Sequence, residues 1–175
     1  RWELSAQVAP SIGDDFLGFQ AFTGQVRNYF KITDSVLFAT RLYGGYSSGD
    51  APDIFVFGGL NTLRGADFMS EVGNKAFYVN NELRFPLVNF AQFPMGLRLA
   101  NIRGLVFMDV GGAWYDDEEF DFWEDGKLKD AVASIGFGVT FNFVGLPLNF
   151  TWSRGTDFEE LDNEWKYSFW IGPKF

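Results

Sequence analysis

The sequence predicts an all-β protein: an antiparallel transmembrane β-barrel of about eight strands that forms a single domain over residues 1–175. Three observations predict this fold. Apolar and polar residues alternate along several segments, which is the period of a strand with one apolar face. Phe, Gly and Trp are abundant, with 22, 20 and 6 residues, as expected of strands with an aromatic exterior. Short and long connections alternate along the chain, which is typical of outer-membrane barrels.

The clearest strands lie near the end of the chain. Residues 131–143 alternate strictly, and the apolar set there is Ala133, Ile135, Phe137, Val139, Phe141 and Phe143. Residues 146–153 repeat the pattern after the short Val144-Gly145 connection, so the two segments predict a hairpin. A further alternating segment covers 165–175 and ends on the aromatic Phe175.

The same reasoning applied upstream gives five more strands. Segments 77–85 and 106–114 alternate in the same way, and strands are also predicted over 2–9, 19–32 and 36–46. The total is therefore eight.

The connections between these strands differ in length. They are short after Ile32 and after Phe143, but long and polar over 47–53, 116–129 and 154–164. Short turns at one rim and long loops at the other are the outer-membrane pattern.

A soluble barrel or β-sandwich would also alternate, so the composition of the two faces has to decide. The polar set is mostly Gly, Ser, Thr and Asn, which would make a poorly soluble exterior. The apolar set is mostly Phe, Trp, Val and Ile, which lipid would accommodate. Aromatic residues near strand ends, such as Trp114, Trp152 and Trp165, fit the interfacial girdles of membrane barrels. The membrane interpretation is therefore favoured.

Composition also excludes whole classes of function. A net charge of −9 argues against nucleic-acid binding, which needs clustered Lys and Arg. The absence of His and Cys removes the usual general base, thiol nucleophile and metal ligands. We therefore expect neither an enzyme nor a cofactor, and a lipid-cleaving barrel enzyme would need an uncommon activated Ser. A passive pore would need more strands than eight.

Acidic runs over 116–125 and 157–164 leave a second role open. Such loops could serve surface interaction, or hold a divalent cation through carboxylate oxygens. A run of charges is more often a solvated loop, so we expect no metal site there.

The stretch Phe57-Gly58-Gly59-Leu60-Asn61-Thr62-Leu63-Arg64-Gly65 resembles the conserved loop of the BamA/TamA-like outer-membrane assembly family, also known as the bacterial surface antigen family. That family has an aromatic residue where Ala66 stands here. Further segments that match in family order are 37–46, 81–87, 107–114 and 167–175.

The resemblance implies that the eight strands are the C-terminal half of a sixteen-stranded barrel, either self-closed or completed by a second copy or another partner. It also implies a multi-pass barrel of a bacterial-type outer membrane, which inserts or translocates proteins there. Its partners would be outer-membrane lipid and unfolded outer-membrane protein clients. POTRA modules and the other half-barrel are not in these 175 residues. The alternative is therefore a minimal eight-stranded barrel with a structural or surface-interaction role and no insertase activity.

The resemblance assigns two sets of site residues. In the family the loop Arg folds into the lumen and pairs with acidic residues on the barrel wall, which implies a tether made by Arg64, Gly65, Glu82 and Asp109. The register agrees, because both carboxylates fall on the inward face of their strands, where a charge needs a partner or water. The last strand resembles the signal that assembly machinery recognises in barrel proteins, and its residues would be Tyr167, Phe169, Ile171, Gly172 and Phe175.

Overall fold

The computed structural model describes residues 1–9, 18–92 and 98–174, which form an eight-stranded antiparallel sheet in the order β1-β2-β3-β6-β7-β10-β11-β12. Every neighbouring pair is antiparallel. The sheet strands are β1 (Trp2–Ala9), β2 (Phe19–Lys31), β3 (Leu37–Gly49), β6 (Lys75–Gln92), β7 (Arg98–Trp114), β10 (Val132–Phe143), β11 (Leu146–Thr156) and β12 (Lys166–Ile171).

Two of the long connections carry small hairpins of their own. The connection from β3 to β6 contains β4 (Phe55–Phe57) and β5 (Glu71–Gly73), and that from β7 to β10 contains β8 (Trp123–Glu124) and β9 (Lys127–Leu128). The described part of the chain has no helix long and apolar enough to cross a membrane.

Most strand predictions agree with the structure to within a few residues, but β6 and β7, predicted over 77–85 and 106–114, are longer and extend to Gln92 and back to Arg98. β6 continues past Pro86 to Gln92, with a register shift between Pro86 and Val88. Because proline has no N–H for the ladder, a bulge at this point lets the strand continue. β12 is shorter than predicted and ends at Ile171, since Gly172 adopts a φ of 139°. Phe175 lies outside the described residues.

The two faces of the sheet differ in chemistry. One face, called the inner face below, carries buried polar side chains, namely Arg41, Asn80, Glu82, Asp109, Ser134, Asn149, Thr151 and Ser153. The other face exposes large apolar residues, and Val106 and Phe137 are each 45% exposed there. This is the reverse of a sheet that buries its apolar face and solvates its polar one.

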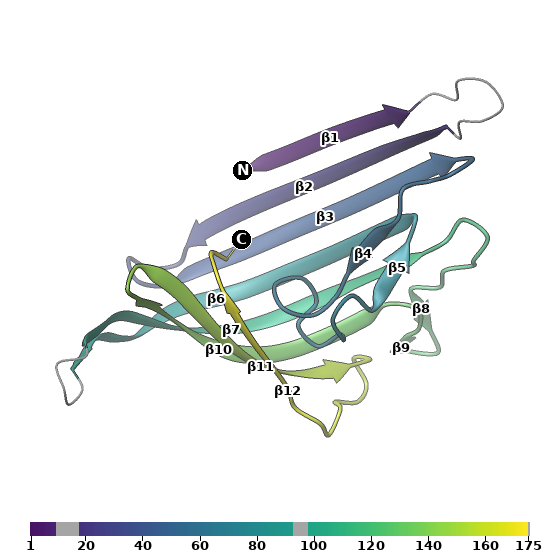
Figure 1. Ribbon diagram of the computed structural model, residues 1–175. Coiled ribbons are helices and arrows are strands. Elements are labelled where there is room, and N and C mark those ends of the chain that lie inside the picture. Colours follow the sequence, from purple (N-terminus) through teal and green to yellow (C-terminus); the bar gives the residue numbers. More distant parts are fainter. Residues whose placement is uncertain (10–17, 93–97, 175) are drawn as a thin grey trace.

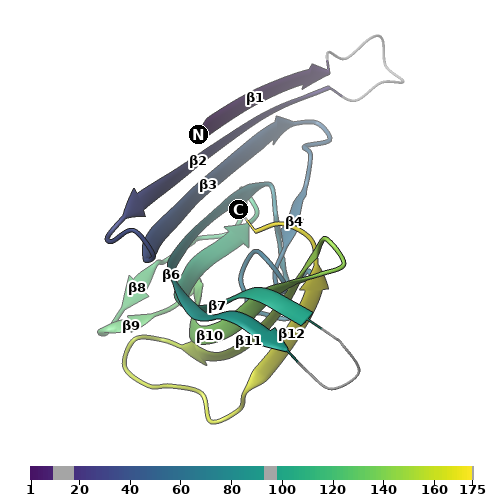
Figure 2. The same cartoon turned by 90° about the vertical axis from the view of Figure 1, so that its left-hand side faces the viewer.

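The sheet curls around its inner face without closing. Figures 1 and 2 show β6 to β12 strongly curved, with β1 to β3 extending away as a flatter wing. Among the described residues β1 pairs with β2 alone and β12 with β11 alone. The structure therefore shows an all-β antiparallel sheet. Over the described residues this sheet does not close into the predicted barrel.

Candidate functional site

The segment between β4 and β5 lies on the inner face of the curved sheet (Figures 1 and 2). It opens with Gly58 and Gly59, whose φ values of 127° and 71° are unfavourable for residues with a Cβ. The Gly59 N–H donates to the Leu63 carbonyl at 2.8 Å, which makes a tight turn. Leu63 is buried and packs with Phe57 and Tyr78. The paired glycines thus fold residues 58–66, called the inner loop below, back onto the sheet.

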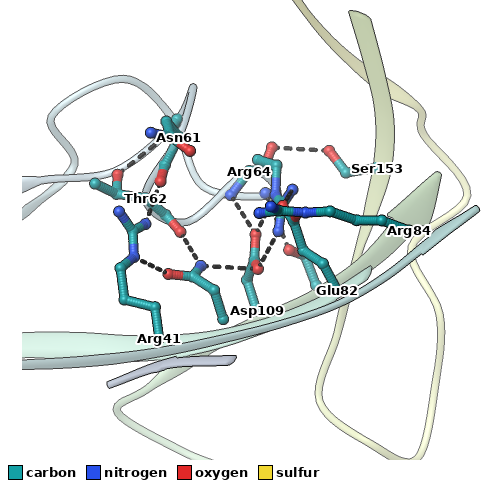
Figure 3. Close-up of polar contacts among 12 residues, drawn as sticks. Arg41, Asn61, Thr62, Arg64, Glu82, Arg84, Asp109 and Ser153 are labelled. Atoms are coloured by element: carbon teal, nitrogen blue, oxygen red, sulfur yellow. Dashed lines mark hydrogen bonds and ion pairs between the residues drawn. The ribbon is translucent and has the colours of Figure 1, made fainter. Parts of the chain in front are cut away.

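Arg64 is the centre of the polar contacts made by the inner loop (Figure 3). Its Nε and Nη2 donate to the two carboxylate oxygens of Asp109 at 2.7 and 2.6 Å, and its Nη1 donates to Glu82 Oε1. The guanidinium carbon also lies 3.6 Å from the centre of the Phe107 ring. Arg64 is only 1% exposed, so this bidentate ion pair forms away from water, where its geometry matters most.

Glu82 and Asp109 come from the neighbouring strands β6 and β7, and both are 0% exposed. Asp109 also accepts hydrogen bonds from the backbone N–H of Arg64 at 3.1 Å and from Asn80 Nδ2 at 2.8 Å. The second oxygen of Glu82 accepts from Arg84 Nε at 2.6 Å. Each buried carboxylate therefore has a cationic partner and further donors, as buried charges require.

A second arm of the network holds the start of the inner loop. Arg41 on β3 donates from Nε to Asn80 Oδ1 at 2.8 Å and from Nη2 to the Asn61 carbonyl. Asn80 Nδ2 also donates to the Thr62 carbonyl. Sequence reasoning missed Arg41 and Asn80, although both occupy inward positions of predicted strands, as Glu82 does. Their inward position in the strand register was the signal that could have identified them.

The end of the inner loop is fixed on the other side. The Gly65 N–H donates to Ser134 Oγ on β10 at 3.1 Å, and Ser153 Oγ on β11 donates to the Arg64 carbonyl at 2.8 Å. A Cβ on Gly65 would lie 2.1 Å from the Ser134 Cβ. The inner loop thus contacts β3, β6, β7, β10 and β11, and glycine at 65 permits the close approach to β10.

The region just beyond the inner loop touches the last strand. Lys166 Nζ on β12 donates to Asp67 Oδ1 at 2.7 Å. This hydrogen bond, assisted by attraction to the same ammonium group, lowers the pKa of the Asp67 carboxyl. Both side chains are well exposed, so the contact is a weak addition to the buried Arg64 network.

The residues predicted as a C-terminal signal lie together on β12 and directly after it. Tyr167, Phe169 and Ile171 project from the outer face and are 70%, 48% and 57% exposed. The Gly172 N–H donates to the Pro147 carbonyl at 2.9 Å. Phe175, the last member of this set, is outside the described residues.

The polar groups around Arg64 bond to one another and to the backbone of the inner loop. They therefore fix the position of the loop on the sheet. Among residues 1–9, 18–92 and 98–174, no group of three or more Asp and Glu side chains is arranged to hold a metal ion.

Comparison with known proteins gives one match that covers nearly the whole chain. A family model described as the Omp85 superfamily domain matches residues 2–175. A search of curated proteins found no match.

Proposed function

The chain belongs to the Omp85 superfamily, and on that premise we propose that it forms part of the wall of a BamA/TamA-type outer-membrane β-barrel that inserts or translocates proteins. In this proposal the chain performs no chemical reaction. It works by presenting an inner loop at a fixed position and strand edges to client chains.

The observation that carries the proposal is the buried Arg64 network. A loop held by a bidentate Asp109 contact, by Glu82 and by backbone contacts to β10 and β11 has one defined position on the inner face. A buried arginine with two carboxylates does not by itself stabilise a protein more than apolar packing would. We therefore propose that these residues serve to hold the loop in one position. We assign the tether to Arg64, Gly65, Glu82 and Asp109.

The chemistry of the two faces supports placement in a membrane. Large apolar side chains such as Val106, Phe137 and Phe169 are exposed on the outer face, where lipid would cover them. The inner face carries the charges, which suits a water-containing or loop-filled interior. The proposed lipid partner is that of an outer membrane of bacterial type.

The strand edges supply the proposed contact with clients. Within the described residues β1 and β12 each have one neighbour, so each offers a row of unpaired backbone groups. An unfolded client strand can add to such an edge, and alternate side chains then give specificity. Tyr167, Phe169, Ile171, Gly172 and Phe175 are the proposed recognition residues of the last strand.

The test compares Arg64→Ala with Arg27→Ala, each made in the chain folded into phosphatidylcholine vesicles. Arg27 is a matched control because it lies on β2 and its guanidinium contacts Gln25 of the same strand. Two properties are measured: protease cleavage within the inner loop, and insertion of an unfolded outer-membrane protein into the same vesicles. We expect Arg64→Ala to speed cleavage at least tenfold and to slow insertion, and Arg27→Ala to change neither.

The two readouts separate the parts of the proposal. Unchanged cleavage in Arg64→Ala would show that the tether does not hold the loop. Faster cleavage with unchanged insertion would reject the insertion role and favour a minimal barrel with a structural or surface-interaction role.

A further inference from the structure

The connection between β7 and β10 folds onto the outer face of the sheet, whereas the inner loop folds onto the inner face. Figure 2 shows β8 and β9 outside the curve of the sheet, on the other side of β6 and β7 from β4. A Cβ on Gly112 of β7 would lie 3.3 Å from the Phe120 ring, and Leu128 is buried in one cluster with Ala133 of β10. Residues 115–130, called the outer loop below, therefore cover the apolar face where these strands end.

The exposure of the strand residues shows where this cover begins. On the outer face of β10, Ile135 is 39% exposed, whereas Ala133, two residues nearer the outer loop, is 3% exposed. On β7, Met108 is 37% exposed, whereas Gly112 is buried. Ile135 and Met108 are directly opposite each other, so the apolar surface open to lipid ends at the same level on both strands.

A row of aromatic rings continues from the sheet onto the outer loop. The ring of Phe77 on β6 lies 6.0 Å from the rings of both Phe120 and Phe122. Trp123 lies 6.4 Å from Phe122 and 5.8 Å from Phe158, which belongs to the connection between β11 and β12. Trp123 is 50% exposed, and Phe122 and Phe158 are each 44% exposed. The row thus runs from the covered sheet face to the exposed surface of the two loops.

Charge limits how deep the outer loop can lie in a membrane. Residues 116–130 contain eight acidic residues and two lysines, and all eight acidic residues are exposed. Lys127 pairs with Glu159 at 2.9 Å. Lys129 pairs with Asp121 at 3.0 Å, so both lysines already have carboxylate partners. Because charged side chains are costly in hydrocarbon, this loop suits the headgroup layer and not the membrane core.

We propose that the outer loop is an interfacial anchor, which seats Phe122, Trp123 and Phe158 in a zwitterionic headgroup layer. Aromatic side chains favour the boundary between lipid and water. The excess of exposed carboxylates is repelled by anionic headgroups, which selects a surface without net negative charge. The hydrocarbon then ends at the level of Met108 and Ile135. The inference rests on the proposed placement of the sheet in a membrane, but not on the insertion of clients.

The test measures the depth of single nitroxide labels in phosphatidylcholine vesicles, from their relative accessibility to oxygen and to a water-soluble nickel chelate. The chain has no Cys, so Trp123→Cys and Phe158→Cys each report one position while the other aromatic residues remain. Phe137→Cys marks the exposed outer face of β10, and Asp117→Cys marks an exposed loop position. We expect the oxygen-to-nickel ratio at 123 and 158 to fall between a high value at 137 and a low value at 117.

A substitution tests whether the exposed aromatic residues hold the loop at that depth. With the label at 158, Trp123→Ser should lower the oxygen-to-nickel ratio at least about twofold, because an aromatic contact with the interface is lost. The matched control is Phe68→Ser, which removes an exposed aromatic residue from the connection between β4 and β5 and should leave the ratio unchanged. Adding phosphatidylglycerol to the vesicles should shift the labels at 123 and 158 toward water, and unchanged ratios would reject the preference for zwitterionic headgroups.

The reference label at 137 separates this inference from the proposed function. Labels at 123 and 158 as accessible to nickel as the label at 117, with 137 in hydrocarbon, would overturn the anchor and leave the membrane placement intact. Labels at 123 and 158 that neither reagent reaches would also overturn it, since a protein surface would then cover the aromatic row. A label at 137 that is in water would instead reject the membrane placement itself.

Discussion

Gly65 sets how closely the inner loop approaches β10. A Cβ at this position would lie 2.1 Å from the Cβ of Ser134, far inside van der Waals contact. We expect Gly65→Ala to displace the inner loop and to destabilise the fold by about 1–3 kcal/mol, the usual cost of overpacking. Urea unfolding in detergent measures the free energy, and protease cleavage measures the position of the loop.

Two companion variants make this prediction specific. Gly44→Ala is the matched control, because a Cβ there would meet no atom within 4 Å. Ser134→Gly combined with Gly65→Ala removes the opposing carbon and should recover the part of the loss that comes from overpacking, while the hydrogen bond from the Gly65 N–H to Ser134 Oγ stays lost. A Gly65→Ala chain as stable and as protease-resistant as Gly44→Ala would show that the loop does not sit against β10.

The two carboxylates around Arg64 are not equivalent. Asp109 accepts two hydrogen bonds from the Arg64 side chain, one from its backbone and one from Asn80. Glu82 divides its oxygens between Arg64 and Arg84. We therefore expect Asp109→Asn to destabilise the fold more than Glu82→Gln. The loss for Asp109→Asn should reach at most about 3–5 kcal/mol, the cost of breaking a buried ion pair.

Asp117→Asn is the control for charge alone, since Asp117 is exposed in a loop, and it should change stability by less than about 0.5 kcal/mol. The measurement is again urea unfolding, with the three variants compared in one detergent. A larger loss of unfolding free energy for Glu82→Gln than for Asp109→Asn would contradict the conclusion that Asp109 contributes more to stability.

At the scale of elements, alternation predicted where the long strands lie, but it gave ranges that were too short for β6 and β7, the two longest. β1, β2 and β3 begin and end within a few residues of their predicted bounds, because a strand with one apolar face repeats its signal over many residues. The β4–β5 and β8–β9 hairpins were not predicted, since strands of three and two residues are too short to show a period.

The candidate site was predictable only in part. Register placed Glu82 and Asp109 on the inner face, and the motif around Arg64 suggested the partner. Ser134 and Ser153 gave no such signal, because serine is common on the polar face and their role depends on which strand the loop approaches. Contacts between distant elements are set by the curvature of the sheet, which alternation does not encode.

The contact between Asp67 and Lys166 predicts a pH-dependent step in the region between β4 and β5. Its hydrogen bond lowers the pKa of Asp67, so the contact contributes fully above the ordinary aspartate pKa, about 4. It is lost as the pH falls through the lowered value in the folded chain. Hydrogen exchange around residue 67 should therefore stay constant from neutral pH to about 5 and rise only below about 4, after correction for the intrinsic rate.

The effect should be small, because both side chains are exposed and screened by solvent. Asp67→Asn should exchange at the faster level at all pH values. A step near neutral pH, or an identical step in Asp67→Asn, would assign the change to another group.

At the scale of the whole molecule, the open sheet leaves two edges of opposite direction. Eight antiparallel strands in sequence make β1 and β12 run antiparallel to each other, so the β12 edge of one copy could pair with the β1 edge of a second. Two such junctions would close a ring of sixteen strands with twofold symmetry, so a client strand could add to an edge only where a junction opens. Exposed side chains on β1, including Trp2 and Leu4 at 74% and 73%, would face lipid on the outside of that ring.

We therefore expect the purified chain, folded in detergent, to have twice its 19.8 kDa mass by light scattering after subtraction of the detergent. Because the chain has no Cys, single cysteines can report the junction directly. A bismaleimide should join Ser5→Cys chains on β1 to Ser168→Cys chains on β12 when the two are folded together, whereas Ser35→Cys, in the turn between β2 and β3, should not crosslink to Ser168→Cys. A folded monomer would instead mean that the sheet closes on itself, and the narrow interior of an eight-stranded barrel would then have to hold the inner loop.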